Sequence, residues 1–335
     1  MNANKPPKFE NFTDDNFAKG DELMADSKWI AGLTPDMQAI DAARAVLAAR
    51  LGVVRHYFPL AVHEADLDVE NVHQLRVATR RAAAALRIFQ PLLGNKALKR
   101  VKSIVRDVRQ AAADARDWDV FVHMVDHSTS LQEKPALAAA NFLSAYAFGQ
   151  RTASQMGLTH IATEKIVTLD EVCDELPDCV ENDHTEDLAS LAESTLTELF
   201  FTLTTGAETV PADPLEMHQF RILGKRVRYA MEVFVDCYTE PFKQELYPAV
   251  EQLQECLGAI QDGHTATTRL TDLFTRLQRS RPETAKQVKV GFASWKAELR
   301  RQIATGKRDF RTWTRDWQKL MVKYPLPMLA LDTND

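Results

Sequence analysis

A nine-residue helical motif occurs twice in this chain, and this repeat restricts the possible folds more than any other feature. The pattern H-x-x-R-x-x-x-[RK]-R begins at His73 and again at His218, 145 residues later. An aspartate follows each histidine after 44 residues, at Asp117 and at Asp262. Two landmarks at one offset in a chain of 335 residues indicate an internal duplication and predict two related halves.

Each copy of the motif has the periodicity of a two-sided α-helix, because side chains three or four residues apart share a face. In the first copy Leu75, Ala82 and Phe89 fall on one edge, which we expect to be buried in a core. The opposite edge carries cations and almost no carboxylates, a composition that suits an anionic ligand. These cationic edges contain His73, Arg76, Arg80 and Arg87 in the first copy, and His218, Arg221, Lys225 and Arg228 in the second.

Composition and periodicity together predict an all-α fold. Only 12 of the 335 residues are glycine, 45% are hydrophobic, and no Asn-Gly turn joins alternating apolar runs as in a β-hairpin. In the first half, helices are expected at about 35–62, 71–93, from 95 onward and 134–156. In the second half, they are expected at about 187–205, 213–237, 242–280, 283–305 and 308–321.

These helices divide the chain into two repeats and three further segments. Residues 1–35 are expected to form a flexible N-terminal extension, and residues 36–156 the first helical repeat. Residues 157–187 contain glycine, proline and clustered acids and are interpreted as an acidic linker. Residues 188–321 are expected to form the second helical repeat, and residues 322–335 a C-terminal tail.

The paired motifs and the aspartate 44 residues after each histidine resemble the CHAD domain (conserved histidine α-helical domain). The resemblance extends from about residue 38 to about residue 320. It implies two internally duplicated four-helix bundles related by pseudo-twofold symmetry, with a basic central channel that binds inorganic polyphosphate. It also suggests that the protein is targeted to polyphosphate granules.

The helix that follows the first motif carries a second row of cations. Lys99, Lys102, Arg106 and Arg109 repeat the 3-4-3 spacing of the motif, and Asp117 falls on the same edge if the helix continues that far. A carboxylate at this place would pair with an arginine and orient it. The second half lacks this row, because its matching positions are occupied by Gln244, Tyr247, Glu251 and Gln254.

We therefore expect the first repeat to contribute most of the charge of the binding site. One side of the channel should be lined by His73, Arg76, Arg80, Arg81, Arg87, Lys99, Lys102, Arg106 and Arg109. The other side should be lined by His218, Arg221, Lys225, Arg226 and Arg228, with Asp117 and Asp262 as orienting carboxylates.

The cation rows differ from an ordinary solvated helix face, on which opposite charges alternate and form ion pairs. Arginine donates two parallel hydrogen bonds to phosphate, whereas lysine supplies a point charge. Side chains four residues apart lie about 6 Å apart along a helix, so a row of them favours a polymer of phosphates over a single small phosphate.

The two motif histidines have two readings that the sequence leaves open. Each could be a helix-start residue bonded to a neighbouring protein group, or an anion ligand that donates a ring N–H. A metal site is not expected, because no second histidine or carboxylate lies four residues away on that face.

The net charge of −6 argues against a general nucleic-acid binder, but the charges are segregated. Residues 73–109 contain ten lysines and arginines and one acid, whereas residues 160–217 contain one lysine and fifteen acids. Such segregation produces a strong local field. No secretory signal is visible, and the longest uncharged run, residues 135–150, is too short to span a membrane. We expect a cytoplasmic protein without a membrane partner.

Catalytic motifs are not found in the sequence. It contains no P-loop, no G-x-S-x-G, no H-E-x-x-H and no Gly-rich dinucleotide turn, nor the E-x-E-x-K of the triphosphate hydrolases that accompany some CHAD domains. We expect a non-enzymatic polyphosphate-binding protein without a cofactor. The alternatives are a phosphate-polymer-handling enzyme or its regulatory subunit and, less favoured, a single-stranded nucleic-acid binder, which would need aromatic residues among the cations.

Overall fold

The computed structural model describes residues 28–176, 185–209, 211 and 213–331, and these residues form an all-α protein. They contain two isolated β-bridges and no longer strand. The predicted all-α fold is therefore confirmed. The helices of the first half are α1 (Ala39–His63), α2 (Glu70–Ile88), α3 (Asn95–Asp126) and α4 (Leu137–Glu175). The helices of the second half are α5 (Leu188–Glu208), α6 (Pro214–Phe234), α7 (Tyr247–Ser280) and α8 (Pro282–Lys323).

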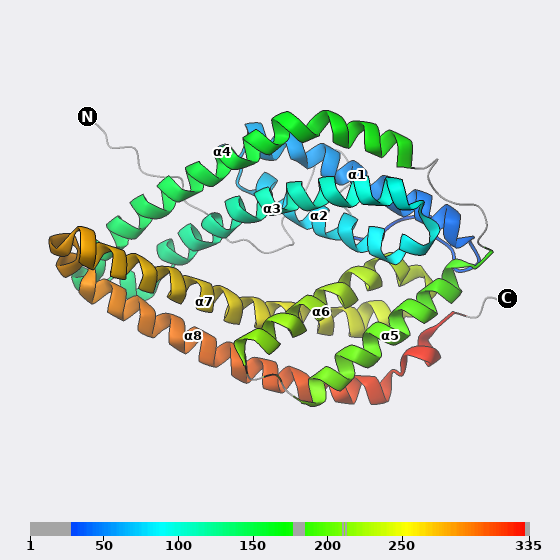
Figure 1. Ribbon diagram of the computed structural model, residues 1–335. Helices are drawn as coiled ribbons and strands as arrows, with labels where there is room; N and C mark the ends of the chain where they lie inside the picture. Colours follow the sequence, from blue (N-terminus) through cyan, green and yellow to red (C-terminus); the bar gives the residue numbers. More distant parts are fainter. Residues whose placement is uncertain (1–27, 177–184, 210, 212, 332–335) are drawn as a thin grey trace.

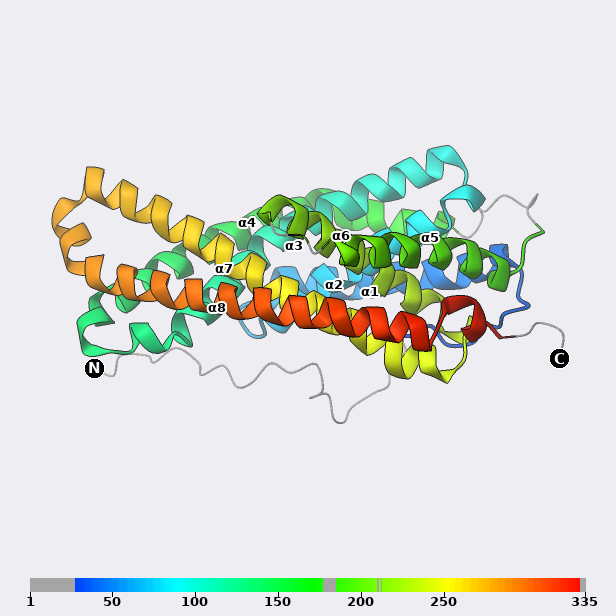
Figure 2. The same cartoon turned by 90° about the horizontal axis from the view of Figure 1, so that it is seen from below.

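The eight helices of the described ranges form an elongated body in which α4 and α8 lie at opposite edges (Figure 1). The view from below shows the same elongation, with the α7–α8 turn at one end (Figure 2). In each half the second helix, α2 or α6, carries the motif, and these two helices pack directly against each other. This order agrees with a duplicated chain, although the duplication itself stays a prediction.

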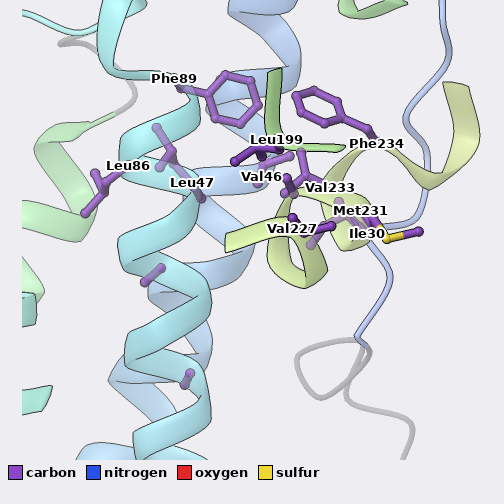
Figure 3. Close-up of a cluster of buried hydrophobic side chains, with 14 of the residues drawn as sticks. Ile30, Val46, Leu47, Leu86, Phe89, Leu199, Val227, Met231, Val233 and Phe234 are labelled. Atoms are coloured by element: carbon purple, nitrogen blue, oxygen red, sulfur yellow. The ribbon is translucent and has the colours of Figure 1, made fainter. Parts of the chain in front are cut away.

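A continuous apolar core holds the two motif helices together. Leu47 of α1, Leu86 of α2 and Phe234 of α6 meet in it, together with Phe89 and Leu199 (Figure 3). Because this core contains side chains from both halves, burial of apolar surface fixes the position of α2 relative to α6.

A second apolar cluster joins the two halves at the end where the α7–α8 turn lies. Phe121 of α3, Leu143 of α4, Leu273 of α7 and Trp295 of α8 are buried in it. Trp295 is almost fully buried here, as are Trp313 and Trp317 in the larger core.

The fourth helix is longer than the sequence indicated. Residues 157–175, interpreted as the start of the acidic linker, continue α4 to Glu175, so the predicted helix end at 156 was wrong. Leu158 and Leu169 extend its buried stripe. The acids are held by ion pairs with the neighbouring helices: Arg55 Nε lies 2.7 Å from Asp170 Oδ1, and Arg100 Nη2 lies 2.6 Å from a carboxylate oxygen of Glu171.

The last two predicted helices, 283–305 and 308–321, are one continuous helix, α8. Gly306 lies at the expected break, but it serves close packing instead of a turn. A Cβ atom there would lie 2.8 Å from Ile260 Cγ1 and 3.4 Å from the carbonyl oxygen of Cys256, both on α7. Residues 1–27, which make up most of the expected flexible extension, lie outside the described residues, as do residues 177–184 of the expected linker and 332–335 of the tail.

One helix among the described residues, α1, is long and apolar enough to cross a membrane by length and composition. Its apolar residues, among them Val46, Leu47 and Phe58, are buried in the core shared with the other helices. The length and composition of α1 therefore have an explanation within the fold.

Candidate functional site

Four cations from the two motif helices lie close together between α2 and α6. We define the central cation cluster as Arg76 and Arg80 of α2 with Arg221 and Lys225 of α6. Burial, as the larger cause, and the charge of Arg76 together lower the pKa of Arg80 to about 10. Residues that are 145 positions apart in the sequence are thus brought into one electrostatic site.

Lys225 has the most strongly altered ionisation in this cluster. Burial is the largest cause, the charges of Arg80, Arg221 and Arg76 act in the same direction, and together they lower the pKa of the Lys225 amine to about 6. A lysine with this pKa is mostly neutral at pH 7. In the free protein the cluster therefore does not keep all four of its basic groups fully protonated at neutral pH.

Asp117 and Asp262, the two duplicated carboxylates, accompany the central cation cluster. Arg76 Nη1 donates a hydrogen bond to Asp117 Oδ1 at 2.6 Å and one to the carbonyl oxygen of Ala113 at 3.3 Å. The predicted pairing of Asp117 with an arginine is therefore found in the structure. Burial raises the pKa of Asp262, while the nearby charge of Arg221 lowers it.

Two further arginines border this site and were not predicted as ligand residues. Arg269 Nη1 donates to the carbonyl oxygen of Asp117 at 2.8 Å, and its guanidinium group lies 4.3 Å from the ring centroid of Trp118. Burial lowers the pKa of Arg116, as does the charge of Arg76. The sequence held a signal for Arg269, since it follows Asp262 by seven residues and so shares its helical face.

Unused hydrogen-bond donors are present in the central cation cluster. Among the described residues, the buried Nε atoms of Arg76 and Arg221 have no hydrogen-bond acceptor. A buried donor without an acceptor costs free energy comparable to a lost hydrogen bond. An oxyanion that entered the cluster would supply acceptors as well as negative charge.

The motif histidines lie one helical turn before the central arginines, and both contact protein groups. His73 Nε2 is 4.0 Å from Glu70 Oε1, and His218 Nδ1 is 3.4 Å from Gln261 Oε1. Gln261 occupies the position that matches Arg116 in the first half. These contacts agree with a helix-start role for both histidines.

A second group of cations continues from the central cluster toward the end of α2. We define the outer cation group as Arg87, Lys102, Arg109 and Arg226. Partial burial lowers the pKa of Arg87, and the charges of Arg226 and Arg109 lower it further. Lys102 Nζ donates to Gln90 Oε1 at 2.6 Å.

The outer cation group borders a groove of about 670 Å³ between α5 and the junction of α2 with α3. Arg87 lies on its wall, with hydroxyl, amide and carboxylate groups contributed by Gln90, Asn95, Ser194, Thr195 and Glu198. The central channel that the resemblance implies stays a prediction.

Lys99 and Arg106 do not share the surroundings of the other predicted ligands. Both side chains are exposed, and Arg106 Nη2 lies 3.2 Å from Oδ1 of Asp107, its neighbour on α3. The regular 3-4-3 spacing of the α3 row therefore does not give its four members one environment. Lys102 and Arg109 approach Arg87, whereas Lys99 and Arg106 face solvent.

Arg81 and Arg228 are engaged inside the protein, contrary to the expectation that they line the binding site. Arg81 Nε donates to Glu232 Oε2 at 2.7 Å. Arg228 Nε lies 3.5 Å from Glu232 Oε1, and its Nη2 donates to Glu251 Oε1 at 2.9 Å. The Glu232 carboxylate is fully buried. The sequence motif did not separate these arginines from their neighbours because their partner lies on α6, far from Arg81 in sequence.

Two more residues complete this arrangement, which we call the Glu232 cluster: Arg50, Arg81, Arg228, Glu232, Tyr247 and Glu251. The Tyr247 hydroxyl donates to Glu232 Oε1 at 2.8 Å, and burial together with the Glu232 charge raises the pKa of that hydroxyl. Arg50 Nη2 lies 3.9 Å from Glu232 Oε2. Tyr247 and Glu251 are two of the residues that replace the α3 cations in the second half, so α7 uses these positions for internal structure.

The described part of the chain gives no metal-binding group of three or more His, Cys, Asp or Glu side chains. The central cation cluster and the outer cation group can bind an anion through charge and N–H donors. They offer a row of positive groups along α2 that begins at Arg76 and ends at Arg87.

The chain is similar to known proteins in both sequence and structure. The family model described as CHAD domain matches residues 38–271. The crystal structure of the CHAD domain from the plant Ricinus communis has a TM-score of 0.66 and 22% sequence identity, and the match covers 86% of this chain and 95% of that chain. PptA from Streptomyces chartreusis has a TM-score of 0.62 and 18% identity, with 82% and 99% covered. No curated protein sequence matches this chain.

Proposed function

The chain belongs to the CHAD domain family, and on this premise we propose that it binds inorganic polyphosphate at the central cation cluster, without catalysis of its own. The ligand is held by hydrogen bonds from guanidinium groups and by attraction between opposite charges. The bound polymer replaces the repulsion among the cations with attraction to phosphate.

One observation carries this proposal: Lys225 is half-buried among Arg80, Arg221 and Arg76, and its pKa is lowered to about 6. Positive groups that repel each other in a folded protein reduce its stability, so their approach needs a compensating partner. Asp117 and Asp262 supply part of the compensation. A multivalent anion supplies the rest and accepts hydrogen bonds from the unused Nε donors of Arg76 and Arg221.

The arrangement favours a polymer over a single phosphate. Arg76, Arg80 and Arg87 follow one edge of α2 over 11 residues, a distance of about 16 Å. Arg221, Lys225 and Arg226 accompany them on α6. A flexible chain of phosphates can contact the central cation cluster and the outer cation group together, whereas a single phosphate contacts only part of either.

We place this activity in the cytoplasm, where binding would bring the protein to deposits of polyphosphate. Attachment to such granules needs no enzyme activity, since polyanion binding alone would retain the protein there.

The proposal is tested by binding of fluorescently labelled polyphosphate to the parent protein and to Arg76→Ala/Arg80→Ala at several salt concentrations. The parent should bind with an affinity that falls as salt rises, because bound cations release counterions from the polymer. The double variant should lose at least tenfold in affinity, and its dependence on salt should be shallower.

The matched control is Lys286→Ala/Lys289→Ala, which removes two exposed cations from α8 at a distance from the motif helices. This control should bind like the parent. A folded parent protein that ignores polyphosphate would contradict the proposal, and so would equal losses in the two double variants.

A further inference from the structure

A second strip of cations covers the solvent-facing side of α8. We define the α8 cation stripe as Arg300, Arg301, Lys307, Arg308, Arg311, Arg315 and Lys319. All of these side chains are exposed except Lys307, which is half-buried. The opposite side of the same helix buries Phe310, Trp313 and Trp317 in the core. The stripe is therefore fixed to the body of the protein by the buried face of the same helix.

The stripe carries a large excess of positive charge in a chain of net charge −6. Seven cations and two acids, Asp309 and Asp316, lie between residues 300 and 319. Asp309 lies 4.0 Å from Arg308 Nε, and Asp316 lies 2.9 Å from Lys319 Nζ. Within the described ranges, no carboxylate lies within ion-pair distance of the remaining five cations: Arg300, Arg301, Lys307, Arg311 and Arg315.

The spacing of these unpaired cations is unfavourable for an isolated helix. Lys307, Arg311 and Arg315 follow one another at four-residue intervals, and like charges at this spacing repel each other. A solvated helix face normally alternates its charges, as the Lys286–Glu283 pair does near the start of α8. The concentration of five unpaired cations in the second part of α8 indicates a surface that suits an anionic partner.

This surface is separate from the family's motifs. The family match ends at residue 271, before α8 begins, and the site described above lies on α2, α3, α6 and α7. The stripe therefore lies outside the paired motifs that carry the resemblance and outside the residues that the family model matches.

We propose that the α8 cation stripe is a second binding surface for linear inorganic polyphosphate. This proposal rests on the proposed function, because it extends the same ligand to another face. The stripe spans 19 residues, which is about 28 Å along the helix. The exposed side of a single helix does not enclose a small anion, since small-molecule sites are concave, but it can follow an extended polymer.

Other polyanionic partners fit this face less well. Single-stranded nucleic acids are bound through aromatic side chains that stack with bases, and the aromatic residues of this segment, Phe310, Trp313 and Trp317, are buried. A helix that binds a membrane inserts its apolar face into the lipid, and the apolar face of α8 is occupied by the core. A chain of phosphates without bases needs neither feature.

The experiment compares two ligands, tripolyphosphate and long-chain polyphosphate, on the full-length protein. Arg311→Gln/Arg315→Gln removes two unpaired cations of the stripe, and Lys286→Gln/Lys289→Gln removes the same charge from exposed positions on the same helix. The stripe variant should bind long-chain polyphosphate about five- to tenfold more weakly, as expected for two exposed charge contacts. The salt slope should fall by roughly 1.4, as for two contacts to a single-stranded polyanion.

Tripolyphosphate is short enough to be held by the central cation cluster alone, so its affinity should be the same in both variants and in the parent. Equal affinity of the stripe variant and the control for long-chain polyphosphate would overturn the α8 proposal and leave the proposed function intact. Loss of binding to single-stranded DNA or to phosphatidylserine vesicles, with long-chain polyphosphate unaffected, would also overturn it. A parent protein that binds neither phosphate ligand would overturn the proposed function itself.

Discussion

Arg80 and Arg81 are consecutive residues of α2, yet they belong to two clusters with opposite electrostatics. Burial and the charge of Arg76 lower the pKa of Arg80 to about 10 in the central cation cluster. Burial also opposes the charge of Arg81, but the attraction of Glu232 and its hydrogen bonds raise the pKa of Arg81 above its ordinary value. Lys225 and Arg228 show the same contrast on α6.

The contrast teaches that the position of a carboxylate, more than the cations themselves, separates the structural arginines from those proposed to bind the ligand. Glu232 is fully buried and contacts Arg81, Arg228 and Arg50, so it completes an internal network. Asp262 attracts Lys225, but this attraction is smaller than the repulsion from Arg80, Arg221 and Arg76, so the repulsion persists. The Glu232 cluster stabilises the α2–α6 contact, and the central cation cluster uses that contact to present charge.

The largest expected effect comes from removing the carboxylate of the Glu232 cluster. Glu232→Gln leaves three arginines without their buried counter-charge, and breaking a buried ion pair in this way costs about 3–5 kcal/mol. The free energy of unfolding, measured by urea denaturation, should fall by that amount. Glu251→Gln is the matched control, because Glu251 is partly exposed and should cost much less. An unchanged urea midpoint for Glu232→Gln would show that the cluster does not hold the two helices together.

The next prediction compares the same substitution at two adjacent arginines, Arg80 and Arg81. Arg80→Gln should lower polyphosphate affinity about tenfold while leaving the free energy of unfolding unchanged or higher, since it removes a repulsive charge. Arg81→Gln should do the reverse and lower stability by about 3 kcal/mol, because a buried carboxylate loses its closest partner. Binding and urea denaturation are measured on both variants. Similar effects of the two substitutions on stability would remove the distinction between the clusters.

The smallest expected effect concerns the exposed members of the α3 row. Lys99→Gln/Arg106→Gln should weaken polyphosphate binding by less than about threefold, the low end for exposed charges, because these two side chains do not share the surroundings of Arg87. Lys102→Gln/Arg109→Gln, which changes the members near Arg87, should have the larger effect. A reversed order in the binding titration would show that the polymer runs along the outer side of α3.

The all-α fold could be predicted because it depends on periodicity, whereas the approach of the two motif helices was expected only from the family resemblance. Helical spacing placed Leu75, Ala82 and Phe89 in the core, and all three are buried. The continuation of α4 beyond residue 156 could not be read in the same way. The acids after Gly157 resemble a loop until the positions of Arg55 and Arg100 are known, since those arginines neutralise them.

The site was predictable only where its residues share a helix face. Arg76 with Asp117 could be found from spacing, because both fall on edges defined by the repeat. The sequence did not show that Arg81 contacts Glu232, because Glu232 lies on another helix and is placed by tertiary packing. The pairing of Arg228 with Glu232 was available from helical spacing, since the two residues lie four positions apart on α6. Arg269 was missed for a different reason: its phase with Asp262 was available in the sequence, but it lies outside the motif.

Lys225 provides the most direct observation of the proposed site. Its ordinary pKa is 10.5, and in the free protein it is lowered to about 6. Between these values the unfolded chain holds a proton that the folded chain lacks, so this lysine's contribution to stability rises with pH in that window. A bound polyanion favours the protonated amine and should raise its pKa, so binding at neutral pH takes up a proton.

The measurement is an NMR titration of isotope-labelled lysine with and without saturating polyphosphate, with Lys225→Met used to assign the resonance. We predict a midpoint near pH 6 in the free protein, and a midpoint raised to about 8 in the complex, as an opposite charge nearby would produce. A midpoint that stays the same while polyphosphate is bound would contradict the assignment of the ligand to the central cation cluster.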